Sequence, residues 1–188
     1  MSVLHKIPLG EEPPEIVNVF IECPSGSRKK YEYNREWDEL VLDRIIPSSV
    51  VFPADYGFIP QTWFSDEDPL DALILSYEPL EIGCIVRARV IGALVIEDEK
   101  GEDPKIVCVP LNDARFDGIK DIKDVHPHKL KEIQEFFETY KRLEPKKFSR
   151  FKEWKNSKEA KELILYANTL YKKKFQESKE NMKDKERN

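Results

Sequence analysis

Three aspartates lie within one short stretch of the chain, Asp66-Glu67-Asp68-Pro69-Leu70-Asp71. Like charges packed this closely repel one another, unless they lie on a solvated loop or a cation neutralises them. Hard divalent cations such as Mg²⁺ take oxygen ligands and often connect a few carboxylates to substrate phosphates. The stretch therefore suggests a metal site that handles phosphate, and a solvated acidic loop is the alternative.

The spacing of the aspartates predicts how they are arranged. If Asp66 and Asp68 are extended, the alternation of a strand places both carboxylates on one side. Pro69 then bends the chain, so that Asp71 can return toward Asp66. A calcium loop of the EF-hand type fits badly, because the stretch lacks the glycine and the distal glutamate. A sugar-nucleotide transferase stays open, although the chain is short and shows no alternating pattern of strands and helices.

Other charged residues indicate an anion site nearby. Asp98 and Asp103 lie at opposite ends of a polar turn, which brings them near each other, and Lys30 shares one face of a strand with Glu32. Arg44 interrupts an apolar strand, where its guanidinium must reach water or an anion, and guanidinium suits phosphate oxygens. An acidic turn and ordinary ion pairs are the alternatives.

Two tyrosines and a lysine join these candidates. Tyr56 precedes a glycine and either presents its hydroxyl to an anion or packs in the core. Tyr140 is in phase with the apolar stripe of a helix, so we expect it to pack with its hydroxyl at the site. Lys141 then extends beside it.

The elements that must position these residues are mostly strands. Apolar and alternating patterns predict strands at 16–23, 30–33, 40–46, 72–76, 85–96 and 105–110, with a bulge at Gly92 and a polar turn over 97–104. The last third has helical periodicity, with one helix from near Pro127 to Tyr140 and another that starts near Asn156, where Glu159 completes a capping box. This order favours a mainly β fold, a small barrel with two C-terminal helices packed outside it.

Length, charge and cysteine content bound the class of protein. The 188 residues suit one domain over 1–175, followed by a charged tail at 176–188 that we expect to fray. No apolar run approaches the ~20 residues of a membrane span, and the first residues lack the apolar core of a signal peptide. The net charge of −5 argues against nucleic acid as a partner. With three widely spaced cysteines, a cytoplasmic location is expected.

Read in chain order, these features resemble the soluble family I inorganic pyrophosphatases, and the prokaryotic members more than the longer eukaryotic ones. The resemblance covers about residues 15–172 and goes well beyond the aspartate signature. Its further motifs are Glu22, Lys30-Tyr31-Glu32, Asp43-Arg44, Pro53 with Tyr56-Gly57, Gly101-Glu102-Asp103 with Lys105, and Phe136-Phe137 before Tyr140-Lys141. Two positions depart from the family pattern: Glu67 stands where a small or polar residue is usual, and Phe52 where a tyrosine is common.

The resemblance implies a fold and an assembly. The family fold is a five-stranded barrel of the oligonucleotide-binding (OB) type with helices outside, and the prokaryotic members are commonly homohexamers. The cofactor implied is Mg²⁺, with several ions bound and Mn²⁺ as a substitute.

The resemblance also implies roles for single residues. Asp66, Asp71 and Asp103 would hold the first metal, and Asp71 would bridge to a second. Asp98, Asp103, Glu22 and Glu32 would complete the sites of metals that arrive with the substrate. Asp68 would orient and deprotonate the attacking water. The phosphoryl groups would be bound by Lys30, Arg44, Tyr56, Lys105, Tyr140 and Lys141.

The function implied is metal-dependent hydrolysis of inorganic pyrophosphate to two orthophosphates, with a metal-activated water as the nucleophile. A binding module for nucleotides or oligonucleotides is a competing class, but the acidic balance and the lack of an aromatic and basic stripe disfavour it. A phosphatase that hydrolyses nucleotides is harder to exclude from residues alone. Comparing pyrophosphate with ATP at matched Mg²⁺ separates these two enzymes.

Overall fold

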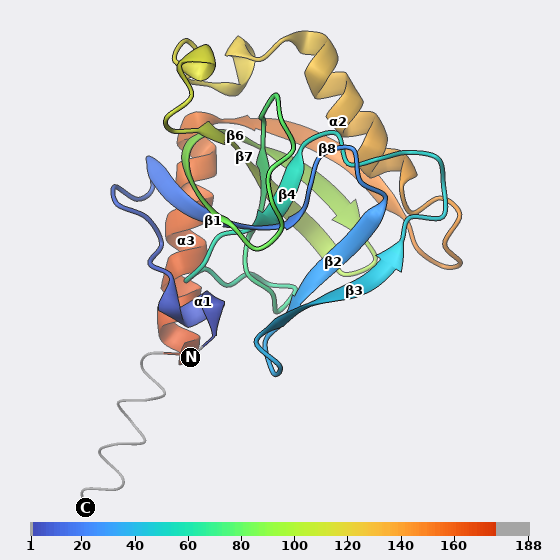
Figure 1. Cartoon of the computed structure of the whole chain (residues 1–188), viewed down its shortest axis with the longest axis horizontal. Coiled ribbons are helices and arrows are strands. Elements are labelled where there is room, and N and C mark those ends of the chain that lie inside the picture. Colours follow the sequence, from blue (N-terminus) through green and yellow to red (C-terminus); the bar gives the residue numbers. More distant parts are fainter. Residues whose placement is uncertain (1, 176–188) are drawn as a thin grey trace, which may run out of the picture.

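Five strands close into a barrel at the centre of the molecule (Figure 1). The computed structural model describes residues 2–175. The barrel order is β1-β4-β5-β7-β6, and β6 pairs back with β1 to close the ring. The strands are β1 (Ile16–Cys23), β4 (Asp55–Phe58), β5 (Asp71–Ile74), β6 (Ile85–Asp98) and β7 (Gly101–Pro110). The predicted mainly β fold with a five-stranded, OB-like barrel is confirmed.

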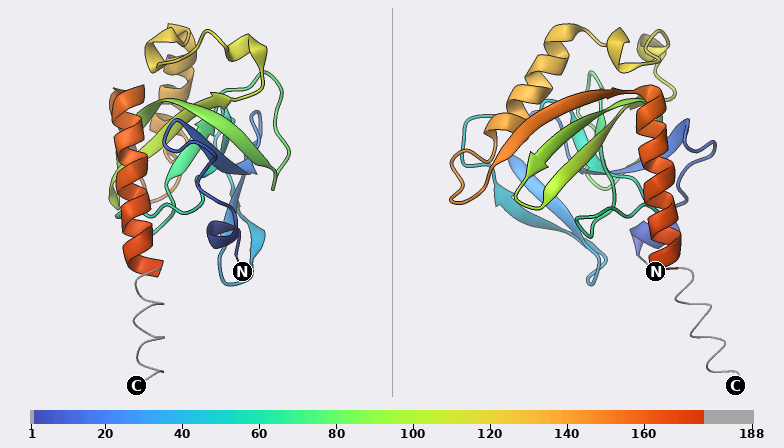
Figure 2. Two further views of the ribbon diagram at one scale, coloured as in Figure 1. Left: turned by 90° about the vertical axis from the view of Figure 1, so that its left-hand side faces the viewer. Right: turned by 180° about the vertical axis from the view of Figure 1, so that it is seen from behind.

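The remaining elements surround this barrel. β8 (Ser149–Asn156) extends the sheet beside β6, while β2 (Lys29–Asn34) and β3 (Glu39–Ile45) form a separate hairpin. The helices are α1 (Val3–Lys6), α2 (Pro127–Thr139) and α3 (Ser157–Phe175), with short 3₁₀ turns at Ala114–Phe116 and Ile122–Asp124. Figures 1 and 2 show α2 and α3 outside the barrel, as predicted for the two C-terminal helices, and on different sides of it. Residues 176–188, predicted to be a frayed tail, lie outside the described residues.

Local sequence explains where both long helices begin. α3 starts with the predicted capping box: the Glu159 N–H donates to Asn156 Oδ1 at 3.1 Å, and the Asn156 N–H donates to Glu159 Oε2 at 3.0 Å. α2 has Pro127 in its first turn, where a missing N–H costs no hydrogen bond. None of the helices within residues 2–175 is both long enough and apolar enough to cross a membrane.

Each face of the barrel strands packs against a different helix. Alternate residues of β7, such as Val107 and Val109, join a cluster with Phe136 and Phe137 of α2. The intervening residues, such as Ile106 and Cys108, join a second cluster with the α3 residues Ala160, Ile164 and Ala167. Because both faces are buried, these strands have continuous apolar runs instead of a polar and apolar alternation.

The predicted strands are confirmed, but two further strands were missed and one turn was predicted too long. β4 and β8 were not predicted, and the polar turn expected over 97–104 is only Glu99–Lys100, since β6 and β7 extend to Asp98 and from Gly101. The bulge expected at Gly92 is confirmed by a register shift between Val90 and Gly92. In β4, a Cβ at Gly57 would lie 1.8 Å from the Phe20 carbonyl oxygen, so β1 approaches closer than any side chain allows.

A buried carboxylate joins the loops on one side of the barrel. Asp55, at the start of β4, is fully buried and accepts hydrogen bonds from the N–H groups of Ser25, at 2.8 Å, and Leu80, at 2.9 Å. The Ser76 hydroxyl also donates to it. One acceptor-only side chain therefore connects the turn before β2 with the loop after β5.

We expect Asp55→Asn to lower the free energy of unfolding by about 2 kcal/mol, because an amide has one acceptor oxygen and its NH₂ would face N–H donors. Urea unfolding measures this loss. Asp117→Asn, at an exposed aspartate, is the matched control and should unfold like the parent protein. Equal midpoints for both variants would contradict the role given to Asp55.

Candidate active site

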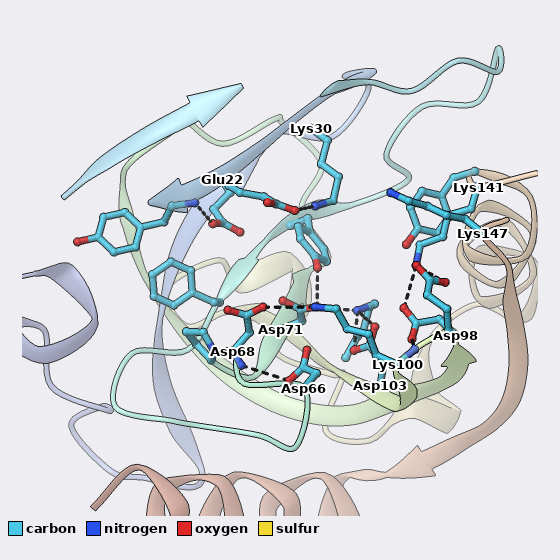
Figure 3. A pocket seen from close by; sticks show the side chains of 18 of the residues that line it. Glu22, Lys30, Asp66, Asp68, Asp71, Asp98, Lys100, Asp103, Lys141 and Lys147 are labelled. Atoms are coloured by element: carbon cyan, nitrogen blue, oxygen red, sulfur yellow. Dashed lines mark hydrogen bonds and ion pairs between the residues drawn. The ribbon is translucent and has the colours of Figure 1, made fainter. Parts of the chain in front are cut away.

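A pocket of about 250 Å³ lies beside the β2–β3 hairpin, the β6–β7 turn and the loop that precedes β5 (Figure 3). Each side chain predicted for the site lines this pocket, although the chain supplies them from β1 to the end of α2. They are Glu22, Lys30, Glu32, Arg44, Tyr56, Asp66, Asp68, Asp71, Asp98, Asp103, Lys105, Tyr140 and Lys141. Their individual roles stay predictions.

The aspartate loop is a tight turn, and the expected extended geometry for Asp66 and Asp68 is wrong. The Phe64 N–H donates to the Asp68 carbonyl at 2.9 Å, and Glu67 lies in the left-handed region with a φ of 67°. The Asp68 N–H donates to Asp66 Oδ1 at 3.3 Å. Both carboxylates still reach the pocket, because the turn returns the chain before Leu70, whose buried side chain anchors the loop.

Lys105 is the buried centre of the acidic side. Its ammonium lies 2.6 Å from Asp71 Oδ2 and 2.8 Å from Asp103 Oδ2, while the Tyr56 hydroxyl donates to Asp71 Oδ2 at 2.5 Å. Burial alone would lower the pKa of Lys105, but the Asp103 and Asp71 carboxylates raise it above its ordinary value. Lys105 therefore stays charged and holds the two aspartates side by side.

Burial raises the pKa of several carboxyl groups near this lysine. Burial, and then the Asp71 and Asp68 charges, raise the pKa of Asp66. Burial raises the pKa of Asp103 to about 6, although Lys105 opposes the rise. On β1, burial raises the pKa of Glu22 to about 8, against a 2.7 Å hydrogen bond from the Tyr33 N–H. A cation close to these groups would favour their ionised forms, most of all that of Glu22.

Two cations face each other across the β2–β3 hairpin. Lys30 and Arg44 are directly opposed in the strand register, an arrangement that is unfavourable unless anions lie near. Lys30 contacts Glu32, and Arg44 contacts Asp43 and donates from Nε to Glu144 Oε1 at 2.9 Å. The ion pairs considered as the alternative are thus present, and the same cations also line the pocket.

The end of α2 supplies a third basic group. Lys141 Nζ lies 2.8 Å from Asp98 Oδ2. Burial alone would raise the pKa of Asp98, but hydrogen bonds from Lys141 and from the Lys100 N–H lower it below its ordinary value. Tyr140 packs against Phe136 with ring centroids 5.2 Å apart and lines the pocket, as its helical phase predicted.

The two departures from the family pattern lie away from this chemistry. Glu67 is exposed, with Lys174 Nζ 3.6 Å from its carboxylate, and it is not among the described residues that line the pocket. Phe52 is buried and packs against Tyr56 and Phe136 at centroid distances of 5.6 and 5.0 Å. Phe52 therefore supports Tyr56 from the core side.

The pocket also has residues that the sequence did not reveal as site residues. The charged ones are Arg35, Glu99, Lys100, Glu102 and Lys147. Glu102 lies at the start of β7 and the others lie in turns or loops. All are in segments rich in charged residues, where composition does not separate a pocket residue from a solvated one. Their approach to the site depends on the tertiary fold.

The donor chemistry of the pocket fits hard divalent cations. Of the described residues, nine carboxylates and seven basic side chains line it, and its lining contains no histidine or cysteine. Within residues 2–175, no three carboxylate, imidazole or thiolate groups already form a ready-made metal cage, and the Lys105 ammonium lies between Asp71 and Asp103. Crowded carboxylate oxygens are the donors that Mg²⁺ prefers.

Comparison with known proteins agrees with this geometry. A family model described as inorganic pyrophosphatase matches residues 19–172. The chain is 45% identical over 174 residues to an inorganic pyrophosphatase of Thermus thermophilus, covering 92% of this chain and 99% of that protein. It is 45% identical over 164 residues to one of Saccharolobus solfataricus, covering 86% and 95% of the two chains. The crystal structure of a Thermus thermophilus inorganic pyrophosphatase superposes with a TM-score of 0.88 at 46% identity, over 90% of this chain and 98% of that one.

Fold and pocket together define a metal-dependent hydrolase. The chain belongs to the inorganic pyrophosphatase family, whose members hydrolyse inorganic pyrophosphate to phosphate.

Proposed function

We propose that this pocket hydrolyses pyrophosphate to two orthophosphates with Mg²⁺ as the cofactor, several ions being bound at once and Mn²⁺ serving as an alternative ion. One observation carries the proposal: Asp66, Asp68, Asp71 and Asp103 gather on one side of the pocket, while Lys30, Lys141 and Lys147 lie across from them (Figure 3). A multiply charged anion with bound cations matches both sides at once. Positioning and charge neutralisation do most of the work in phosphoryl transfer.

In this proposal the acidic side holds the metal ions. Asp66, Asp71 and Asp103 would bind the first ion, and Asp98, Glu22 and Glu32 would complete further sites with them. When bound, Mg²⁺ withdraws charge from phosphate oxygens and lowers the pKa of its own water. The raised pKa values of Glu22 and Asp103 support this assignment, because cations would favour the ionised carboxylates.

Asp68 is the proposed general base. Its carboxylate is half exposed and lies at the open side of the acidic cluster, whereas Asp71 and Asp103 are already bound to Lys105. It would orient the attacking water and accept its proton. Asp71 and Asp103 are poorer choices, because they are less exposed to water and lie 2.6 and 2.8 Å from the Lys105 ammonium.

The basic side would bind the two phosphoryl groups. Lys30 and Arg44 offer adjacent cations from the hairpin, and Tyr140 and Lys141 extend from the end of α2. Tyr56 and Lys105 would also bind phosphate oxygens. Both already donate to the Asp71 carboxylate, so they also hold that carboxylate in place.

We further propose that the protein is a cytoplasmic homohexamer. The hexamer is proposed from the family resemblance, and the exposed apolar side chains of Leu42 and Ile45 on β3 are available for contacts between chains. The three free cysteines, Cys23, Cys84 and Cys108, suit a reducing compartment, and recovery in the soluble cell fraction away from the envelope tests this location.

We expect Asp68→Asn to reduce phosphate release from pyrophosphate at least ~10²-fold, because losing a general base costs this much or more. Colorimetric phosphate assays measure the rate, and a thermal melt checks that the fold survives. Glu67→Gln removes the same charge from the next residue, outside the pocket, and should leave the rate unchanged. Near-normal turnover in Asp68→Asn would remove Asp68 from its role.

Light scattering after size-exclusion chromatography tests the assembly. A hexamer has six times the 22.1 kDa mass of the chain, about 130 kDa, as expected for closed point-group symmetry. A mass equal to one chain at micromolar concentration would refute the proposal.

A further inference from the structure

The carboxylate of Asp68 is held between two cations from different parts of the fold. Arg35, in the turn after β2, places Nη2 3.4 Å from Asp68 Oδ1. Lys100, in the β6–β7 turn, places Nζ 3.9 Å from Asp68 Oδ2. Within residues 2–175, these are the ion pairs and hydrogen bonds that the Asp68 carboxylate makes. They are therefore the side-chain partners that restrict the orientation of its two oxygens.

Arg35 is itself fixed by an aromatic ring. Its guanidinium carbon lies 4.7 Å from the centroid of the Trp63 ring, a distance at which a cation is attracted to the ring face. Trp63 is buried, and its backbone N–H donates to the Ala167 carbonyl of α3 at 3.0 Å. Its ring packs edge-to-face with Phe175, with ring centroids 5.0 Å apart. α3 thus holds Trp63 through its backbone and its ring, and the Trp63 ring in turn contacts Arg35.

The Arg35–Asp68 pair contributes little to stability but can matter for the reaction. Both side chains are more than 40% exposed, and exposed ion pairs typically add only about 0–1 kcal/mol. The position of a catalytic group has a much larger effect on the rate, because a misplacement of about 1 Å can cost ~10²-fold. The backbone of Asp68 is fixed by its turn, whereas its carboxylate rotates unless its side-chain partners hold it.

We propose that Arg35, stacked on Trp63, is a positioning residue that orients the Asp68 carboxylate toward the attacking water. This inference rests on the proposed role of Asp68. Arg35 acts through Asp68, so its loss slows the chemical step and leaves substrate binding nearly unchanged. A ligand of pyrophosphate would behave in the opposite way, since its loss would weaken binding.

The test compares Arg35→Met with Arg35→Lys in the full-length protein, using steady-state kinetics with pyrophosphate and Mg²⁺. We expect kcat to fall about tenfold in Arg35→Met, less than a full misplacement costs, with KM within about twofold of the parent. Arg35→Lys keeps the charge and should recover most of the rate. A thermal melt should show equal midpoints.

A matched control is available elsewhere on the surface. Arg115 is also exposed, stacks 4.6 Å above the Tyr77 ring and pairs with Glu78 and Asp113, but it does not line the pocket. Arg115→Met should change neither kcat nor KM. If it lowers kcat as much as Arg35→Met does, the effect is not specific to Asp68 and the inference fails.

A double-mutant cycle separates this inference from the proposed function. In an Asp68→Asn background, Arg35→Met should have no further effect, because the group that it orients is gone. A further tenfold loss there, a rise in KM without a change in kcat, or unchanged kinetics in Arg35→Met would each overturn the positioning role. If Asp68→Asn alone keeps full activity, the role of Asp68 fails first, and that of Arg35 with it.

Discussion

A buried ammonium between two carboxylates is the interaction on which the rest of this site depends. β5 and β7 run parallel with Asp71 opposite Lys105 in register, and Asp103 precedes Lys105 by two residues, so alternation places both on one face. Removing one member of such a cluster leaves an uncompensated buried charge, which is strongly unfavourable. The closed barrel supplies the rigid strands that hold these groups, and its two helices bury the strand faces on either side.

Lys105 satisfies Asp71 and Asp103 but leaves the surrounding acidic groups under-compensated. Glu22, with its pKa raised to about 8, accepts a backbone hydrogen bond and forms no ion pair with any residue from 2 to 175. Lys30 and Arg44 are adjacent on the facing hairpin, where each also contacts carboxylates. Ligands of both signs that enter the pocket would add partners for the charged groups on its two sides. The pocket is therefore arranged for cations and a polyanion together, which is what pyrophosphate hydrolysis requires.

Much of this could be predicted from the sequence, where the signal is local. The bounds of β1, the capping box at Asn156 and the bulge at Gly92 follow from patterns that a few neighbouring residues determine. β4 was missed because it is four residues long and interrupted by Gly57, and β8 because charged residues obscure its alternation. Pairing with β1 and with β6 stabilises these strands, and such pairing is not visible in a single segment.

In the site, too, some residues could be predicted from the sequence and others depend on the tertiary fold. Its principal residues were found because their types and order resemble a known family, and the fold brings them to one pocket. Arg35 and Lys100 could not be found in this way, since each is one basic residue in a charged turn, and their approach to Asp68 depends on Trp63, α3 and the β6–β7 turn. The extended geometry expected for Asp66 and Asp68 was wrong, because Glu67 adopts a left-handed conformation that side-chain patterns do not predict.

The central claim, that carboxylates distant in sequence converge to hold cations, is tested most directly by crystals grown with Mn²⁺, whose anomalous X-ray signal locates the ion. The account predicts a peak about 2–2.5 Å from carboxylate oxygens of Asp66, Asp71 and Asp103. Mn²⁺ bound only elsewhere, with these three carboxylates facing no ion, would contradict it.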